Sequence, residues 1–420
     1  MELALYCPVY GYYETTPDTI GQGGNYYTNV SVGSLFGELL AFQFAEWLQK
    51  GPVGRDSRST ELQFCAPFIQ DSRRDGTLGS AGTIEKRPAK GAGESGAPRQ
   101  ELQLVEAGAH DGCLAKDILG WLRQHRPGLW RRLEYWIVEP SERRQEWQKR
   151  TIGRFANKLR WVKDLTEVAG FRHSPLDACH SAGIRGIIFS NELLDALPVR
   201  RLGWSATNRA WFEWGVTIKN GRFVWTRMPG IQCKGQSLRT PKSDACRPPV
   251  TLQRSNVPPR PGLDLPAELL AVLPDGFTTE VCPAAEQWWR QAASVLEWGK
   301  LLTLDYGLRA DEFFEPQRKE GTLRAYRRHR VIGDVLAHSA EQDITAHVNF
   351  TSLQTAGEVA GLRTDTLVTQ TQFLTEIAAR SWNNGSSLET WSPERRRQFQ
   401  TLTHPEHLGR SFRVLIQSRG

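Results

Sequence analysis

The stretch "NELLDALP" at 191–198 concentrates polar side chains directly after an apolar run, with Asn191, Glu192 and Asp195 as its functional groups. Two carboxylates and an amide at the end of a strand suit the binding of a cationic or amide group. A guanidinium fits well, because carboxylates accept paired hydrogen bonds from it. A helix N-cap at Asn191 followed by a first-turn acid explains the same residues without chemistry. Asp305 in "LDYG" supplies a further carboxylate, which we expect on the substrate side.

A second candidate is the stretch "LVEAGAHDGCL" at 104–114. Its two glycines, Gly108 and Gly112, follow a buried strand and precede a helix, where backbone can approach a ligand and free N–H groups are available. The spacing is not GxGxxG, so a dinucleotide is a poor match. S-adenosylmethionine needs only N–H donors for its carboxylate, an acid for its ammonium and another for its ribose. A plain turn after a buried strand remains the alternative.

Side chains near these glycines extend the predicted cofactor site. Asp111 lies inside the loop, and His110 takes a place where glycine is usual, so it either borders the cofactor or points to solvent. Glu139 ends the second apolar run, "IVEP", where a ribose carboxylate is expected. Asp164 follows the third run, "WVKD", and is expected at the adenine end. Each of these residues can also be explained without a cofactor, as an ordinary turn or surface residue.

The elements that must position these residues alternate along the chain. "LQLVEAG", "LEYWIVEP", "RGIIFSN" and "GKLLTLDYG" read as buried strands, and "CLAKDILGWLRQ" and "SERRQEWQKR" read as helices between them. This alternation predicts a parallel sheet with helices on both faces. Near the start, "SLFGELLAFQFAEWLQK" reads as a helix whose apolar positions cover more than half of its circumference, which indicates a helix pinned between two layers.

Five segments follow from composition. We expect an N-terminal helical lid at 1–50, a flexible insertion rich in Gly, Ser and charge at 51–100, and the cofactor-binding half of the main domain at 101–200. Residues 201–282 are predicted to form a β-rich insertion, with a hairpin turn at "KNGR" and a Pro-rich connection. Residues 283–420 are expected to complete the main domain.

Composition excludes several classes. The formal net charge is +7 in 420 residues, but no nucleic-acid motif accompanies it. The seven cysteines form no CxxC pair, so we expect neither a metal site nor a disulfide framework. The first residues resemble neither a signal nor a transit peptide, and no apolar run reaches membrane-spanning length. We expect a soluble protein of the bacterial cytoplasm rather than of the mitochondrial matrix.

The chain resembles the MidA family of S-adenosylmethionine-dependent methyltransferases. The resemblance rests on "GYY", "GGNYYTN", "FGELLA", "LVEAGAHDGCLAKDIL", "NELLDALPV", "LDYG", "TLRAYRRH", "DITAHVNF" and "TQFL", in that order. Mitochondrial members of this family assist respiratory complex I assembly by methylating an arginine of one subunit.

The resemblance assigns roles to particular positions. It implies that Glu106, Gly108 and Gly112 form the cofactor loop, with Glu139 as the ribose acid. Thr28 and Asn29, together with the "FGELL" helix, would close over the cofactor. Asn191, Glu192 and Asp195 would lie at the methyl-transfer centre, and His347 and Asn349 would line the substrate site.

We therefore expect a class I methyltransferase: an α/β, Rossmann-like, doubly wound and mostly parallel sheet that binds S-adenosyl-L-methionine. The expected acceptor is an arginine of a protein such as a respiratory-complex subunit, with neither nucleic acid nor membrane as partner and a homodimer left open. The altered "AHD" loop keeps open a cofactor-binding assembly factor without methyl transfer. A nicotinamide-dependent enzyme and a nucleic-acid methyltransferase are further alternatives, which the missing GxGxxG and the missing reader motif disfavour.

Overall fold

The computed structural model describes residues 1–15, 28–50, 101–170, 183–228, 263, 265–328, 330–383 and 391–420. The expected flexible insertion at 51–100 and most of the expected Pro-rich connection lie outside these residues, and so does "GGNYY" of the N-terminal motif.

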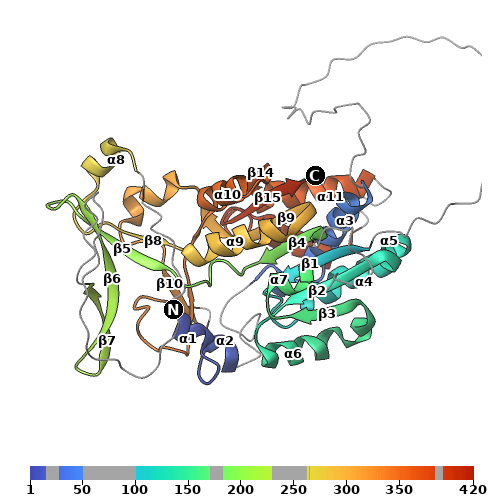
Figure 1. Cartoon of the computed structure of the whole chain (residues 1–420), viewed down its shortest axis with the longest axis horizontal. Coiled ribbons are helices and arrows are strands. Elements are labelled where there is room, and N and C mark those ends of the chain that lie inside the picture. Colours follow the sequence, from blue (N-terminus) through green and yellow to red (C-terminus); the bar gives the residue numbers. More distant parts are fainter. Residues whose placement is uncertain are drawn as a thin grey trace, which may run out of the picture.

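One large sheet forms the centre of the molecule (Figure 1). Its strands in spatial order are β14 (Arg363–Thr369), β15 (Phe412–Arg419), β9 (Leu296–Leu308), β4 (Ile184–Asn191), β1 (Leu102–Ala107), β2 (Leu133–Val138) and β3 (Leu159–Val162), with the short β13 (Val348–Asn349) beside β9. Neighbours from β3 to β9 are parallel, whereas β15 runs antiparallel to both β9 and β14. The predicted doubly wound, mostly parallel sheet is confirmed, and its order reverses between β1 and β4.

Helices cover both faces of this sheet, because successive strand residues point to opposite sides. Leu104 of β1 packs into one apolar core and its neighbour Val105 into the other. The first core is covered by α3 (Leu35–Gln49), α4 (Cys113–His125), α5 (Pro127–Arg132), α6 (Glu142–Ile152), α11 (Gln370–Asn383) and α12 (Pro393–Thr403). The second is covered by α7 (Leu165–Gly170), α9 (Pro283–Val295) and α10 (Phe350–Val359). Among the described helices, none is long and apolar enough for a membrane crossing.

Helix α3 is enclosed on most of its circumference, but by neighbouring helices of its own layer as well as by the sheet, rather than between two layers as predicted. Both Phe36 and Phe44 have no exposed surface, and the helix contacts α4, α11 and α12. It therefore forms part of the layer that covers the sheet (Figure 1).

A second, antiparallel sheet extends from one end of the molecule (Figure 1). Its order is β7 (Arg222–Arg227), β6 (Ala210–Lys219), β5 (Arg200–Ser205) and β8 (Thr278–Val281), and α8 (Ala267–Val272) lies beside it. The predicted Asn-Gly hairpin turn joins β6 to β7, with φ of 52° at Asn220 and 73° at Gly221. Positive φ at both central residues is what a two-residue hairpin requires.

A third, three-stranded sheet lies between the two others (Figure 1). Its order is β11 (Arg330–Ile332), β10 (Arg324–Arg327) and β12 (Asp343–Thr345). The short helices α1 (Glu2–Tyr6) and α2 (Tyr12–Thr15) pack against it in a small apolar core that includes Leu5, Ala325 and Ile344. The N-terminal residues are thereby brought next to the carboxyl end of β4. Four 3-10 turns complete the described elements: η1 (Val30–Val32), η2 (Gly153–Lys158), η3 (Asp311–Phe314) and η4 (Pro316–Arg318).

Candidate functional site

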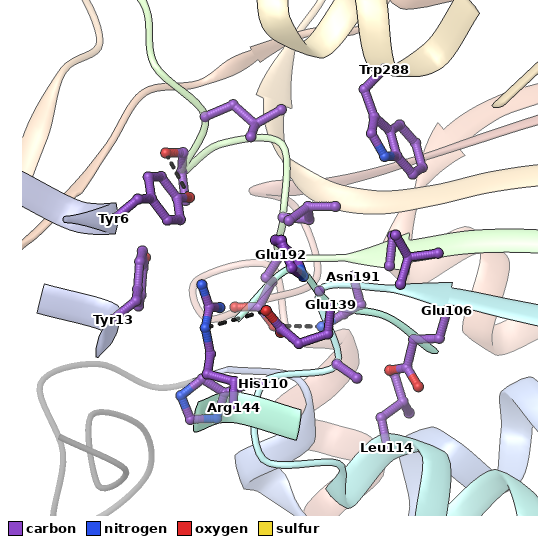
Figure 2. A pocket seen from close by; sticks show the side chains of 18 of the residues that line it. Tyr6, Tyr13, Glu106, His110, Leu114, Glu139, Arg144, Asn191, Glu192 and Trp288 are labelled. Atoms are coloured by element: carbon purple, nitrogen blue, oxygen red, sulfur yellow. Dashed lines mark hydrogen bonds and ion pairs between the residues drawn. The ribbon is translucent and has the colours of Figure 1, made fainter. Parts of the chain in front are cut away.

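A cavity of about 650 Å³ opens at the carboxyl ends of β1, β2 and β4, where the strand order reverses. The loops after β1, β2, β3 and β4 form most of its wall, and the segment Thr28–Ser31 and side chains of α1, α2, α4, α6, α7 and α9 also line it (Figure 2). This is the place at which doubly wound sheets bind ligands, and the volume suits a small organic molecule.

The loop after β1 is shaped by left-handed backbone. Gly108 has φ of 76° and Gly112 has φ of 86°, and Gly112 begins helix α4. A Cβ at Gly108 would lie 2.8 Å from Leu193 Cδ1, so the loop packs directly against the loop after β4. His110 has φ of 45° without being glycine, an uncommon conformation that often marks functional sites. His110 therefore has a backbone conformation that glycine adopts more easily, and its predicted role beside the cofactor stays a prediction.

Glu106, at the end of β1, is buried at the pocket wall. The hydroxyl of Tyr135 donates a hydrogen bond of 2.6 Å to its Oε2. Burial raises the pKa of Glu106 to about 7, and the Tyr135 hydrogen bond opposes that rise. In the same loop, burial would raise the pKa of Asp111, but hydrogen bonds from His110 and Cys113 hold it at about 2.

Glu139, at the end of β2, is held by a network of donors. The backbone N–H of Ser141 donates to its Oε1 at 3.0 Å, and Nε2 of Gln148 donates to its Oε2 at 3.2 Å. Arg144 Nε lies 3.6 Å from Oε1, and a guanidinium nitrogen of Arg144 lies 3.5 Å from Glu14 of α2. Arg144 thus joins the carboxyl end of β2 to the N-terminal helices (Figure 2).

Asp164, after β3, lies at the far end of the pocket lining. Its carboxylate accepts two hydrogen bonds from Nε2 of Gln291, at 2.8 and 3.0 Å. Trp288, one turn earlier on α9, also lines the cavity (Figure 2). An acid, an amide and a large aromatic ring therefore meet where the sequence predicts the adenine end.

The loop after β4 carries Glu192 in a left-handed conformation, with φ of 52°. Its Oε1 accepts hydrogen bonds from the backbone N–H of Asn29 at 2.8 Å and from Nδ2 of Asn191 at 3.1 Å. Nδ2 of Asn29 donates to Oδ1 of Asn191, and Gln370 donates to Oδ1 of Asn29. A connected set of amides therefore fixes the Glu192 carboxylate at the pocket wall.

Behind this wall lie three more carboxylates, and we name the four together the acid cluster: Glu192, Asp195, Asp305 and Asp343. Burial raises the pKa of Glu192 to about 8, of Asp305 to about 7 and of Asp343 to about 6. Burial, and then the charges of its neighbours, raise the pKa of Asp195 well above its ordinary value. Within the part of the chain that the structure describes, no Lys or Arg forms an ion pair with any of the four.

Two predicted substrate residues, His347 and Asn349, have structural surroundings of their own. Oδ1 of Asn349 accepts the backbone N–H of Ser352 at 3.1 Å, so it caps helix α10. His347 is largely buried, and burial, aided by Arg318 and Arg324, lowers its pKa to about 4. Its Nδ1 has no hydrogen-bond partner among the described residues.

The cavity brings together nine of the predicted site residues: Thr28, Glu106, Gly108, His110, Asp111, Glu139, Asp164, Asn191 and Glu192. Five do not line it: Gly112, Asp195, Asp305, His347 and Asn349. The helix that contains "FGELL", α3, contributes no lining residue either. Sequence reasoning did not select Tyr6, Tyr13, Arg144, Trp288 or Asp343. The motifs "GYY" and "DITAHVNF" contain Tyr13 and Asp343 and were the available signals.

Comparison with known proteins agrees with this geometry. Residues 91–368 match the model of a family described as "Putative S-adenosyl-L-methionine-dependent methyltransferase". A crystal structure of a candidate methyl transferase from Burkholderia thailandensis bound to S-adenosyl-homocysteine is 25% identical, with a TM-score of 0.68, covering 100% of this chain and 86% of that chain. A native crystal structure of an uncharacterized Burkholderia thailandensis protein is also 25% identical, with a TM-score of 0.67, covering 100% and 85%.

Proposed function

The chain belongs to the family of S-adenosyl-L-methionine-dependent methyltransferases whose model matches residues 91–368, and we propose that it methylates a guanidinium nitrogen of a protein arginine. Its central sheet has the class I methyltransferase fold. Its cofactor is S-adenosyl-L-methionine, which supplies an activated methyl group on a sulfonium. The acceptor and the roles of individual residues are the proposal.

The pocket residues fit this cofactor. The left-handed loop at Gly108 lines the cavity, and only glycine fits there, because a Cβ would lie 2.8 Å from Leu193 Cδ1. We assign the amino-acid end of the cofactor to this loop and Glu106, because backbone N–H groups suit a carboxylate and a carboxylate suits an ammonium. Glu139 is assigned to the ribose hydroxyls, and Asp164 with Trp288 to the adenine.

The acid cluster is the observation that carries the acceptor assignment. Three buried carboxylates and the half-buried Glu192, without a cationic partner among the described residues, are unfavourable unless protons or a bound cation neutralise them. Glu192 is the member that reaches the cavity. A guanidinium entering beside it would receive charge-assisted hydrogen bonds, and the three aspartates behind the wall would add a negative potential.

Glu192 is assigned two tasks. The entering guanidinium favours the ionised form of Glu192, and Asn29 and Asn191 already hold the carboxyl group in the position that orients this cation. The nitrogen that gains the methyl group must also give up one proton, and the raised pKa of Glu192 makes its carboxylate a competent acceptor. Positioning is the larger contribution, since arginine stays cationic until late in the transfer.

A cofactor-binding assembly factor without methyl transfer is the second candidate. Oε1 of Glu192 already accepts two hydrogen bonds from the protein, and Asp195 and Asp305 lie behind the wall. A purely structural acid cluster would have these same features. Only a measurement of methyl transfer can therefore distinguish the enzyme from the assembly factor.

The test uses the purified full chain. Calorimetry with S-adenosylhomocysteine establishes cofactor binding, and methyl-labelled S-adenosylmethionine is then incubated with the chain and bacterial lysate proteins. We expect label in methylarginine after acid hydrolysis of the labelled protein, including any respiratory-complex subunit that the resemblance suggests. Label in another amino acid contradicts the arginine assignment. Tight cofactor binding with no label under any condition supports the assembly factor.

A further inference from the structure

We propose that Tyr13 is a positioning residue of the acceptor site, which holds Asp343 in place within the acid cluster. This inference rests on the proposed function, since it concerns the side of the pocket where the guanidinium would bind. It adds Tyr13 and the N-terminal helix α2 to that site.

The contact between the two residues is direct. The hydroxyl of Tyr13 donates a hydrogen bond of 2.5 Å to Oδ1 of Asp343, across 330 positions of sequence. Asp343 is buried in β12, with 1% of its surface exposed, and Tyr13 lines the cavity. Tyr13 therefore connects the cavity wall to a carboxylate that the cavity itself does not reach.

The ring of Tyr13 is fixed from two sides. The Tyr6 ring centroid lies 5.5 Å from that of Tyr13, and the Tyr6 hydroxyl donates to the carbonyl of Ala196, beside Asp195. On the other side, the Arg144 guanidinium lies 5.7 Å from the Tyr13 ring centroid, within cation–π range. Figure 2 shows Tyr6, Tyr13 and Arg144 on the same side of the pocket. A hydroxyl on a ring held in this way can set the position of its partner.

The surroundings of Asp343 contain several titratable or charged groups. The tyrosines are Tyr6 of α1, Tyr13 of α2 and Tyr326 of β10, and the cation is Arg144 of α6, near Tyr6 and Tyr13. The carboxyl groups are the other members of the acid cluster: Glu192 and Asp195 after β4, and Asp305 of β9. Tyr13 is the side chain whose hydrogen bond favours the ionised form of Asp343, against burial that disfavours it. Loss of the Tyr13 hydroxyl should therefore shift the position of the Asp343 carboxylate and raise its pKa.

The first test does not require methyl transfer. Carboxyl carbons of aspartate are labelled with carbon-13 in the full chain, and the Asp343 signal is assigned by its absence in Asp343→Asn. We expect Tyr13→Phe to raise the pKa of Asp343 by about one unit, since the ionised form loses a hydrogen bond. The control is Tyr10→Phe, which removes a half-exposed hydroxyl from the same segment and should leave the pKa unchanged. An unchanged pKa in Tyr13→Phe overturns the inference.

The second test measures the acceptor site with Nα-acetyl-L-arginine amide, titrated into the chain saturated with S-adenosylhomocysteine. Tyr13→Phe should weaken probe binding about fivefold or more while S-adenosylhomocysteine affinity stays within twofold. The double variant with Asp343→Asn should bind the probe no more weakly than Asp343→Asn alone, because Tyr13 acts through Asp343.

The outcomes separate the two proposals. Equal probe affinity in wild type and Tyr13→Phe overturns only the role of Tyr13. Failure of the wild type to bind the probe overturns the guanidinium assignment, and with it the acceptor role of Tyr13, even where the pKa of Asp343 moves. Parallel losses of probe affinity, cofactor affinity and stability show that Tyr13 is merely structural, and contradict the inference.

Discussion

The backbone N–H of Leu194 donates a hydrogen bond of 2.8 Å to Oδ2 of Asp305, and the N–H of Leu193 donates to the same oxygen at 3.2 Å. Oδ1 of Asp305 accepts the N–H of Tyr306. Both carboxylate oxygens are therefore acceptors: Oδ2 holds the loop that begins with Glu192, and Oδ1 binds the backbone of β9. A buried residue behind the pocket wall thus controls the geometry of one that reaches the pocket.

This relationship predicts the effect of Asp305→Asn. An amide offers an acceptor on one side only, so either the N–H groups of Leu193 and Leu194 or the N–H of Tyr306 lose their acceptor, which costs about 1–3 kcal/mol of unfolding free energy. We expect denaturant unfolding to show that loss, and methyl transfer to fall about tenfold or more. S-adenosylhomocysteine affinity should change less than threefold. Wild-type transfer by a destabilised Asp305→Asn would contradict this role of the loop.

Glu192→Gln is predicted to separate transfer from cofactor binding. The substitution keeps the size of the side chain but removes the charge that would orient a guanidinium, so we expect transfer to fall about 100-fold or more. S-adenosylhomocysteine affinity, measured by calorimetry, should stay within about threefold. The matched control is Glu376→Gln on the exposed surface of α11. Equal losses of transfer and cofactor affinity would refute the assignment of Glu192 to the acceptor.

The acid cluster predicts that the cofactor-free protein loses stability as pH rises. The pKa of Glu192 is about 8 in the folded chain against an ordinary value of 4.5. Between these values the folded state binds a proton that the unfolded state has released, so the free energy of unfolding falls with increasing pH. Urea unfolding at pH 5.5, 6.5 and 7.5 should show this fall.

Glu192→Gln should reduce the slope by up to about 1.4 kcal/mol per pH unit, the limit for one proton. Glu376→Gln should keep the wild-type slope, because its side chain is exposed. A slope that Glu192→Gln leaves unchanged would show that Glu192 does not titrate in this range.

Gly108→Ala is predicted to damage the cofactor loop. Alanine at a φ of 76° is strained by about 1–2 kcal/mol, and its Cβ would press on Leu193 at 2.8 Å. We expect S-adenosylhomocysteine to bind about tenfold more weakly or worse. Gly128→Ala is the control, since no atom lies within 4 Å of the added Cβ and Gly128 lies in helix α5. Unaltered cofactor affinity in Gly108→Ala would remove this loop from the cofactor site.

Much of the cofactor half was predictable from local pattern. Apolar runs that end in Glu106, Glu139 and Asn191 are neighbouring parallel strands, and parallel strands place their carboxyl ends on one edge. Local sequence periodicity was therefore sufficient to predict that these three side chains lie close together.

The acceptor side was less accessible to sequence reasoning, because its contacts are long-range. Arg144 lies in "SERRQEWQKR", a sequence typical of a solvent-exposed helix. In the structure α2 packs against Arg144 and buries its side chain. Asp343 belongs to a small antiparallel sheet, and no local sequence pattern predicts where that sheet lies relative to the pocket. His347 and Asn349 were predicted from the motif "DITAHVNF", whose first residue, Asp343, belongs to the acid cluster.

The position of β15 has a consequence for synthesis on the ribosome. This strand is formed by residues 412–419, yet it lies between β9 and β14 within the central sheet. Until those residues emerge, β9 and β14 lack the partner that joins them, and Val414 and Leu415 are missing from the two apolar cores. Before β15 is synthesised, most of the central sheet can form, but β9 is left as an edge strand. We therefore expect a transient need for a chaperone that shields such edges.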